Sequence, residues 1–212
     1  MIAKLKSLEK GQRLQYFKDY YLLKCIAVLL VICFAISLGK DVYNNSNIVM
    51  NISFANSTIE PDGISFLKED FKKDIKLSKR KNIAVGYAGS IKYAEDANNA
   101  YTLSNKLVVG DPDVLIVDEN GYRTLAYSKP FLNFEEDFKD DEEIQKIMEK
   151  YGVRNTDIDG NVTYIDAIDI SDTNFVKNYI RTNDDSKIYF TVAVASAHLD
   201  YVKQLIKFLE ES

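Results

Sequence analysis

The feature that most constrains this chain is an apolar segment at residues 20–39, with the sequence YYLLKCIAVLLVICFAISLG. Its length, about twenty residues, is what a helix needs to cross the hydrocarbon core of a bilayer. Lys24 is its one charged residue and lies near the amino end, where a long side chain can reach the headgroups. Because backbone polar groups find no water in lipid, we expect a transmembrane helix here.

Two other structures share part of this pattern. A core helix of a soluble domain usually keeps a polar face, and this segment has none over about four turns. A cleaved signal peptide has a shorter apolar region, although Ala35 and Ser37 have the spacing of a cleavage site. We therefore expect an uncleaved anchor, with the lipid bilayer as the partner of residues 20–39.

The distribution of charge predicts the orientation of this anchor. Up to Lys24 the chain has six basic and two acidic side chains, and the remainder has 21 basic and 30 acidic ones. Positive segments stay on the cytoplasmic side. We expect a single-pass cell-membrane protein with four parts: a cytoplasmic arm at 1–19, the helix at 20–39, a linker at 40–47 and an extracytoplasmic domain at 48–212. The acidic domain argues against nucleic acid as a partner.

The sequence holds no established catalytic motif, neither a nucleophile elbow, a metalloprotease helix nor a nucleotide-binding loop. Both cysteines, Cys25 and Cys33, lie in the apolar segment, so the domain has no disulfide and no zinc site built from Cys and His. His198, the single histidine, stands at the start of the last expected helix, where a surface or capping role is favoured. We expect no catalytic residue, no cofactor and no enzyme activity.

Residues 48–212 alternate between two hydrophobic periodicities. Runs of β-branched and apolar residues predict strands at 48–54, 82–87, 113–118, 161–170 and 187–195. Helical spacing predicts helices at 61–75, 95–109, 135–150, 171–179 and 197–211, with a shorter one near 122–127. The run Val-Leu-Ile-Val at 114–117 is apolar on both faces, as in a strand covered on both sides. The pattern predicts one three-layer α/β domain with a mainly parallel, five-stranded mixed sheet.

Three of these expected strands end in polar turns. In an open parallel sheet, ligands bind beyond the carboxyl ends of strands, close to helix amino termini. The candidate ligand-binding residues at those ends are Asn56, Ser57, Thr58, Gly89, Ser90, Asp118, Glu119 and Asn120. Each group also suits an ordinary strand-to-helix turn, and a parallel sheet would bring all three to one edge.

Residues 155–166 have part of the spacing of a calcium-binding loop. Asn155, Asp157 and Asp159 take its first, third and fifth places, and Gly160 takes the sixth. The twelfth place holds Asp166 in place of a bidentate glutamate, and a strand pattern follows where a helix should. A plain Asp-Gly turn is therefore favoured, and we predict no metal site.

Residues 110–126, GDPDVLIVDENGYRTLA, resemble a recurring segment of extracytoplasmic solute-binding proteins of bacterial transporters. The portion 188–209 is similar to their late strand and chain-end helix. The segment KLKSLEKGQRLQYFKDYYLLK resembles the amino-terminal anchor of small single-pass membrane proteins of Gram-positive bacteria. Solute-binding proteins close two lobes on a ligand. The resemblance here implies a single lobe, because this chain has room for one.

These observations predict a membrane-anchored extracytoplasmic binding or accessory module of unknown ligand, serving a transporter or sensor in the same membrane. One alternative is a cell-surface hydrolase, which needs an acidic cleft with two carboxylates at a fixed separation. Another is a purely structural protein of the envelope. A concave pocket at the strand ends would favour the binding module over the structural protein.

Overall fold

The structure, a computed structural model, describes residues 22–91, 97–156, 161–182 and 186–211. The chain divides into two compact units, residues 1–47 and residues 48–212. The expected cytoplasmic arm, residues 1–19, and the first two residues of the expected transmembrane helix lie outside the described residues.

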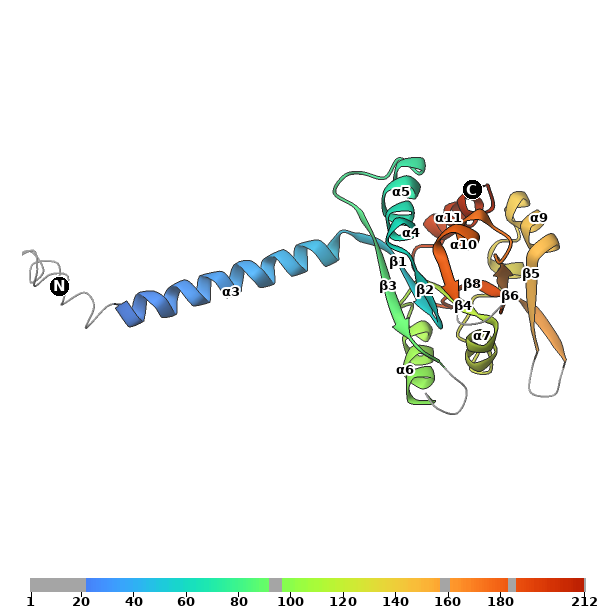
Figure 1. Cartoon of the computed structure of the whole chain (residues 1–212), viewed down its shortest axis with the longest axis horizontal. Coiled ribbons are helices and arrows are strands. Elements are labelled where there is room, and N and C mark those ends of the chain that lie inside the picture. Colours follow the sequence, from blue (N-terminus) through green and yellow to red (C-terminus); the bar gives the residue numbers. More distant parts are fainter. Residues whose placement is uncertain (1–21, 92–96, 157–160, 183–185, 212) are drawn as a thin grey trace, which may run out of the picture. The chain divides into compact units, whose positions relative to one another are not determined.

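Helix α3, Leu22–Ser46, is the described part of the first unit (Figure 1). It includes residues 40–46, which the sequence predicts as part of a linker; the helix continues through them. Its side chains from Leu22 to Ser37 are exposed in the single chain. Within the part of the chain that the structure describes, no helix reaches the combined length and apolarity of a membrane span.

The second unit contains eight described strands in two sheets. The main sheet has six strands in the order β3-β1-β4-β8-β6-β5, and a small second sheet pairs β2 with β7. The strands are β1 Ile48–Ala55, β2 Ser57–Ile59, β3 Asn82–Gly89, β4 Val114–Asp118, β5 Gly152–Thr156, β6 Val162–Asp169, β7 Ile180–Thr182 and β8 Ile188–Val192. The α/β class predicted from the sequence is confirmed.

The prediction of a mainly parallel, five-stranded sheet is wrong. Strand β1 is parallel to β3 and β4, whereas the pairs β4–β8, β8–β6 and β6–β5 are antiparallel. The reason lies in the segment between β6 and β8, whose helix has only six residues. Because a helix advances less than half as far per residue as a strand, this helix is too short to return along β6. The chain therefore re-enters the sheet at the end where it left: the amide of Ile170 donates to the carbonyl of Ile188.

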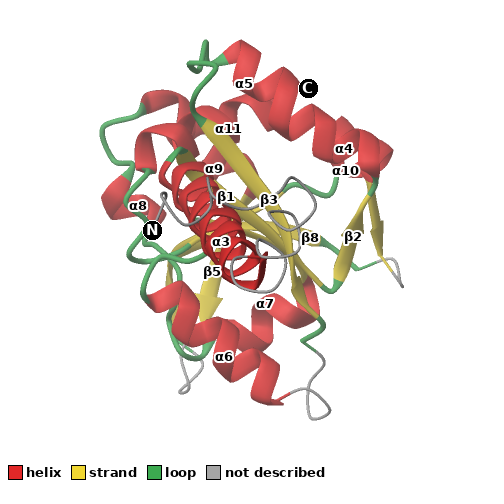
Figure 2. Cartoon of the chain, turned by 90° about the vertical axis from the view of Figure 1, so that its left-hand side faces the viewer, coloured by secondary structure: helices red, strands yellow, loops and turns green. Residues whose placement is uncertain are grey.

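Helices cover both faces of the main sheet (Figure 2). One face packs against a group of helical segments: the π-helical turn η1 Phe66–Asp70, α5 Phe71–Asp74, α8 Phe134–Asp137, α9 Glu142–Tyr151, α10 Asn174–Tyr179 and α11 Leu199–Glu211. The short helix α4, Pro61–Ser65, packs against α10. The other face packs against α6 Ala97–Val108 and α7 Glu119–Ala126. Strand β4 contributes Val114 and Ile116 to the first core and Leu115 and Val117 to the second. The inference that this strand is covered on both sides is confirmed.

Two polar groups away from the pocket described below have structural roles. Thr173 accepts a hydrogen bond from the amide of Val176 and caps α10. At the start of α11, Nδ1 of His198 lies 3.0 Å from Oδ1 of Asp113, which also accepts a hydrogen bond from Ser196 Oγ. His198 therefore helps to tie the last helix to the start of strand β4.

Candidate functional site

The three polar strand ends predicted from the sequence meet at one residue, Asn56. Its Nδ2 donates to Oδ1 of Asp118 over 2.8 Å and to the carbonyl of Ile91 over 3.1 Å, and its Oδ1 accepts from the amide of Ile91. Its own amide donates to the carbonyl of Gly89. The backbone of Asn56 has a positive φ, in the left-handed region that asparagine tolerates better than most residues.

These strand ends are a closed structural joint. Oδ1 of Asp118 also accepts from the amide of Gly121 and caps α7. A methyl group at Gly121 would come within 2.6 Å of Val117 Cγ2 and 2.9 Å of Asn56 Nδ2, so the joint is tightly packed. With both ends of the Asn56 amide engaged in hydrogen bonds, we assign it to holding β1, β3 and β4 together.

The remaining sequence-predicted residues lie around this joint. Ser57 is buried and donates to the carbonyl of Ala55, whereas Thr58 is exposed on β2. The carbonyl of Ser90 accepts from Asn99 Nδ2, and that of Asn120 accepts from Thr124. Glu119 forms an ion pair with Arg123, which lines a different region, described next.

A pocket of about 220 Å³ lies between α7, β5 and β8. Helix α7 and the residue after it contribute one wall, β5 a second and β8 a third. The lining residues are Tyr122, Arg123, Ala126, Tyr127, Val153, Arg154, Asn155 and Tyr189. Asn155 fixes two of these walls to each other, because its Nδ2 donates to the carbonyl of Ala126 at the end of α7.

A buried carboxyl group stands directly behind the pocket wall. The hydroxyl of Tyr122 donates to Oδ1 of Asp166 over 2.5 Å, and Asp166 on β6 is 0% exposed. Its other oxygen, Oδ2, has no hydrogen-bond partner among the described residues. Burial raises the pKa of Asp166 to about 6, and the neighbouring polar groups of Tyr122 and Asn155 oppose that rise. Burial, together with the charge of Asp166, also raises the pKa of Tyr122, so its hydroxyl remains a donor.

Tyr189 forms another part of the wall, edge-on to Tyr122 with ring centroids 5.1 Å apart. The residue is only 6% exposed, yet its hydroxyl makes no hydrogen bond within the described part of the chain. Burial raises its pKa, the negative charge of Glu119 adds to the rise, and Lys187 opposes it. The pocket wall thus contains a protonated hydroxyl that is free to donate.

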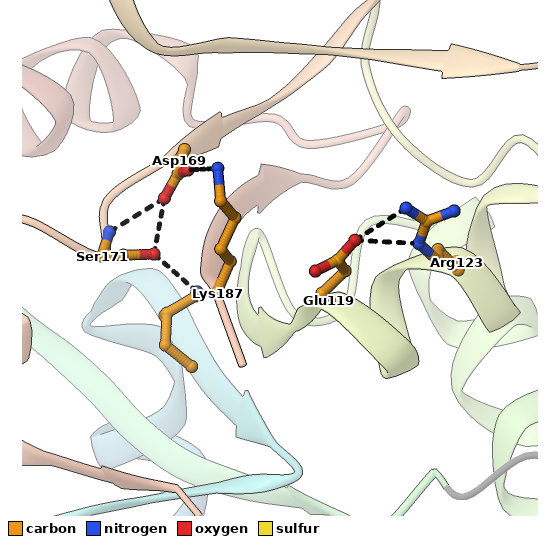
Figure 3. Close-up of polar contacts among 6 residues, drawn as sticks. Glu119, Arg123, Asp169, Ser171 and Lys187 are labelled. Carbon is orange, nitrogen blue, oxygen red and sulfur yellow. Dashed lines mark hydrogen bonds and ion pairs between the residues drawn. The ribbon is translucent and has the colours of Figure 1, made fainter. Parts of the chain in front are cut away.

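Two charged pairs, Glu119–Arg123 and Asp169–Lys187, lie at the ends of β4, β6 and β8 (Figure 3). On α7, Arg123 donates through Nε and Nη2 to Oε1 of Glu119. Across from it, Nζ of Lys187 lies 2.8 Å from Oδ2 of Asp169. Oδ1 of Asp169 accepts from both the amide and the hydroxyl of Ser171. Both acids here, Glu119 and Asp169, have a basic partner.

On β5, the second pocket arginine is more firmly held. Both terminal nitrogens of Arg154 contact the carboxylate of Glu135, and Nη1 also donates to the carbonyl of Thr163. These hydrogen bonds hold the Arg154 guanidinium in place, and its hydrogen bond to Glu135 lowers the pKa of that carboxyl group. The two arginines reach the same pocket from α7 and β5.

The first and last residues of the calcium-loop pattern do not lie in a loop. Asn155 and Asp166, its first and twelfth residues, lie on the paired strands β5 and β6, while residues 157–160 fall outside the described residues. Asp166 is directed to Tyr122 in the core, not to a loop. Among the described residues no cluster of His, Cys, Asp and Glu has a metal-binding arrangement.

A smaller cavity of about 140 Å³ lies on the opposite face of the sheet, between α9 and α11. Its floor is apolar and includes Ile168, Phe190 and Leu209. Two of the carboxylates at its rim, Asp169 and Asp172, are ion-paired with lysines. The candidate site is the pocket between α7, β5 and β8, where the Tyr189 hydroxyl has no hydrogen-bond partner among the described residues.

Sequence reasoning missed this pocket, and of its lining residues it considered only Asn155, as a calcium ligand. One signal was present. Asp166 stands between Ile165 and Ala167 in an apolar strand, where a charged residue is costly without a role. Comparison with protein-family models, with curated proteins and with solved structures gave no match.

Proposed function

We propose that this chain is a membrane-anchored binding module. The apolar segment at residues 20–39 anchors it in the bilayer, and residues 48–212 form an extracytoplasmic domain that binds a small ligand between α7, β5 and β8. The observation that carries the proposal is the free hydroxyl of Tyr189, a residue 6% exposed, in the wall of a pocket of about 220 Å³.

The pocket supports ligand binding over a purely structural role. The hydroxyl of Tyr189 has no protein partner among the described residues and is not fully enclosed, so it is available to a ligand or to water. Concave sites with aromatic walls and a few oriented polar groups are typical of small-molecule binding. Here the aromatic walls are Tyr122 and Tyr189, and the polar groups belong to Arg123, Arg154 and Asn155.

The same pocket favours binding over carboxylate-dependent hydrolysis. No carboxylate is among its described lining residues. Asp166 is 0% exposed and hydrogen-bonded to Tyr122, so it does not reach a substrate in the pocket. We therefore propose binding without chemistry.

The anchor is proposed from α3 and the charge distribution. Its side chains from Leu22 to Ser37 are apolar on nearly all sides and exposed in the single chain, as suits contact with lipid. The basic residues before it favour a cytoplasmic amino terminus. A domain held at the membrane in this way is suited to serve a transporter or sensor in the same bilayer.

The test is a thermal-shift screen of the full-length chain in detergent or nanodiscs, using a library of small metabolites. A ligand at one hundred times its Kd stabilises a fold by about 2.7 kcal/mol, or about 5–10 °C for a domain of this size. Val153→Phe, which fills the pocket, should abolish the shift, and Val194→Phe, an exposed site after β8, should leave it intact. A library without a stabilising compound, or equal shifts in Val153→Phe, would refute the proposed site.

A further inference from the structure

We infer that the ligand of this pocket is a small organic anion, with one carboxylate or phosphate group bound by Arg123 and Tyr189 and a flat apolar body against the tyrosine rings. This inference rests on the proposed function, because it names the chemistry of the same site. It follows from the charge of the lining, the free donors and the shape of the walls.

The charged groups that line the pocket are all cationic. Arg123 enters from α7 and Arg154 from β5, and no described lining residue is acidic. Their ion-pair partners Glu119 and Glu135 are not among the described lining residues. Arginine is therefore the one charged residue type in the described lining, which favours an anionic ligand over a cationic one.

Arg123 has hydrogen-bonding capacity to spare. Its Nε and Nη2 share a single oxygen of Glu119, and Nη1 makes no hydrogen bond within the described residues. Its side chain is 72% exposed, so it can turn toward a ligand at little cost in packing. Guanidinium groups match the geometry of carboxylate and phosphate oxygens, which they bind with charge-assisted hydrogen bonds.

Tyr189 supplies a neutral donor to the same pocket. Because burial and Glu119 raise its pKa, the hydroxyl keeps its proton at neutral pH and can donate to an anionic oxygen. A guanidinium and a hydroxyl donor in one pocket form a site for an oxyanion, and the guanidinium repels an ammonium group.

The walls beside these donors are suited to a flat body. The rings of Tyr122 and Tyr189 meet edge-on and form an aromatic corner, and Ala126 and Val153 complete an apolar wall. Engineered apolar cavities that bind benzene are smaller than this pocket. Its volume of about 220 Å³ therefore leaves room for a ring and an oxyanion group.

The experiment titrates the full-length chain in nanodiscs with four probes of one shape: benzoate, phenyl phosphate, benzylamine and benzyl alcohol. Whichever of the two anions, benzoate or phenyl phosphate, binds more tightly should bind at least about tenfold more tightly than benzyl alcohol. We expect no binding of benzylamine. The order of benzoate and phenyl phosphate identifies which oxyanion the site prefers.

Matched variants assign the contacts. Arg123→Ala should weaken the anion by about tenfold, the loss of one charge-assisted hydrogen bond, and Tyr189→Phe by about fivefold. Arg181→Ala removes another exposed arginine that is paired with a glutamate, Glu60 next to β2, and should change nothing. Unchanged Tm values without ligand show that each variant folds.

The outcomes separate this inference from the proposed function. If benzyl alcohol or benzylamine binds as tightly as the anions and Val153→Phe abolishes that binding, the pocket stands and the anion inference is overturned. If none of the four probes binds, or if Arg123→Ala leaves anion affinity unchanged, the anion inference is again overturned. The proposed function is then decided by the metabolite screen alone.

Discussion

The hydroxyl of Tyr122 donates to Oδ1 of Asp166 over 2.5 Å in a region from which solvent is excluded, and the second carboxylate oxygen has no partner among the described residues. A carboxylate with one hydrogen-bonded and one bare oxygen is costly to bury. The hydrogen bond therefore holds the Tyr122 ring in place, while the buried charge of Asp166 destabilises the fold.

Asp166 should make the stability of the fold depend on pH. Its pKa is raised by burial to about 6 from a value of 3.8, with Tyr122 and Asn155 opposing the rise. Well below pH 4 the carboxyl is protonated in both the folded and unfolded chains and has no effect. As the pH rises from 4 to 6 the unfolded chain loses its proton first, so stability falls by about 3 kcal/mol and then stays constant.

Comparison with Asp166→Asn isolates this effect, because the amide does not titrate. Urea unfolding between pH 4 and pH 7, followed by near-ultraviolet circular dichroism of the tyrosines, should show a decline in the wild type that is absent in Asp166→Asn. Asp172→Asn, at an exposed and ion-paired position, should keep the decline. Parallel pH profiles for the wild type and Asp166→Asn would contradict the account of this buried carboxyl.

Asn56 should be a large contributor to stability. Asn56→Ala removes three side-chain hydrogen bonds and leaves the buried carboxylate of Asp118 with one donor fewer, so we expect a loss of about 3 kcal/mol. Asn56→Gly loses the same bonds but adopts the positive φ without strain. It should be about 1 kcal/mol more stable than Asn56→Ala. Chemical denaturation checks both values, and a less stable glycine variant would argue against backbone strain at this position.

Residues 20–39 should hold the full-length chain in membranes against alkaline extraction. Leu30 lies in the middle of the apolar segment, where arginine costs about 3 kcal/mol in insertion. Leu30→Arg should shift the protein toward the extracted fraction, and Val109→Arg, at an exposed site of the domain, should not. Release of the wild-type protein by alkaline wash would rule out the anchor.

Calcium should leave the Tm of the protein unchanged. The twelfth residue of the loop pattern, Asp166, is directed into the core and bonded to Tyr122, so the loop lacks its last ligand. A thermal melt with and without millimolar calcium measures this directly. A rise of several degrees would show that residues 155–166 bind calcium.

The sequence predicted those helices and strands whose pattern lies within one continuous stretch of the chain. The run at 114–117 is apolar on both faces, and the structure places it between two helical layers. The direction of β8 was not predictable in this way, because it depends on whether the segment from Ile170 to Lys187 crosses the sheet. Strands β2 and β7, of three residues each, are too short to give a periodicity.

The candidate site was predicted less well than the fold, for a physical reason. The polar ends of the three parallel strands β1, β3 and β4 do meet, as expected. Asn56 hydrogen-bonds to the other two ends, so these polar groups bind one another instead of a ligand. The pocket instead joins Tyr122, Asn155 and Tyr189, which lie on three separate elements. Their proximity comes from the antiparallel pairs of β8 with β4 and β6, the part of the topology that the sequence did not predict.

The measurement that tests the central claim most directly is calorimetric titration of benzoate into the wild-type chain and into Val153→Phe. The account predicts saturable binding to the wild type and none to the variant with the filled pocket. Equal saturable binding in the two proteins would show that benzoate binds elsewhere and would contradict the assignment of this pocket as its binding site.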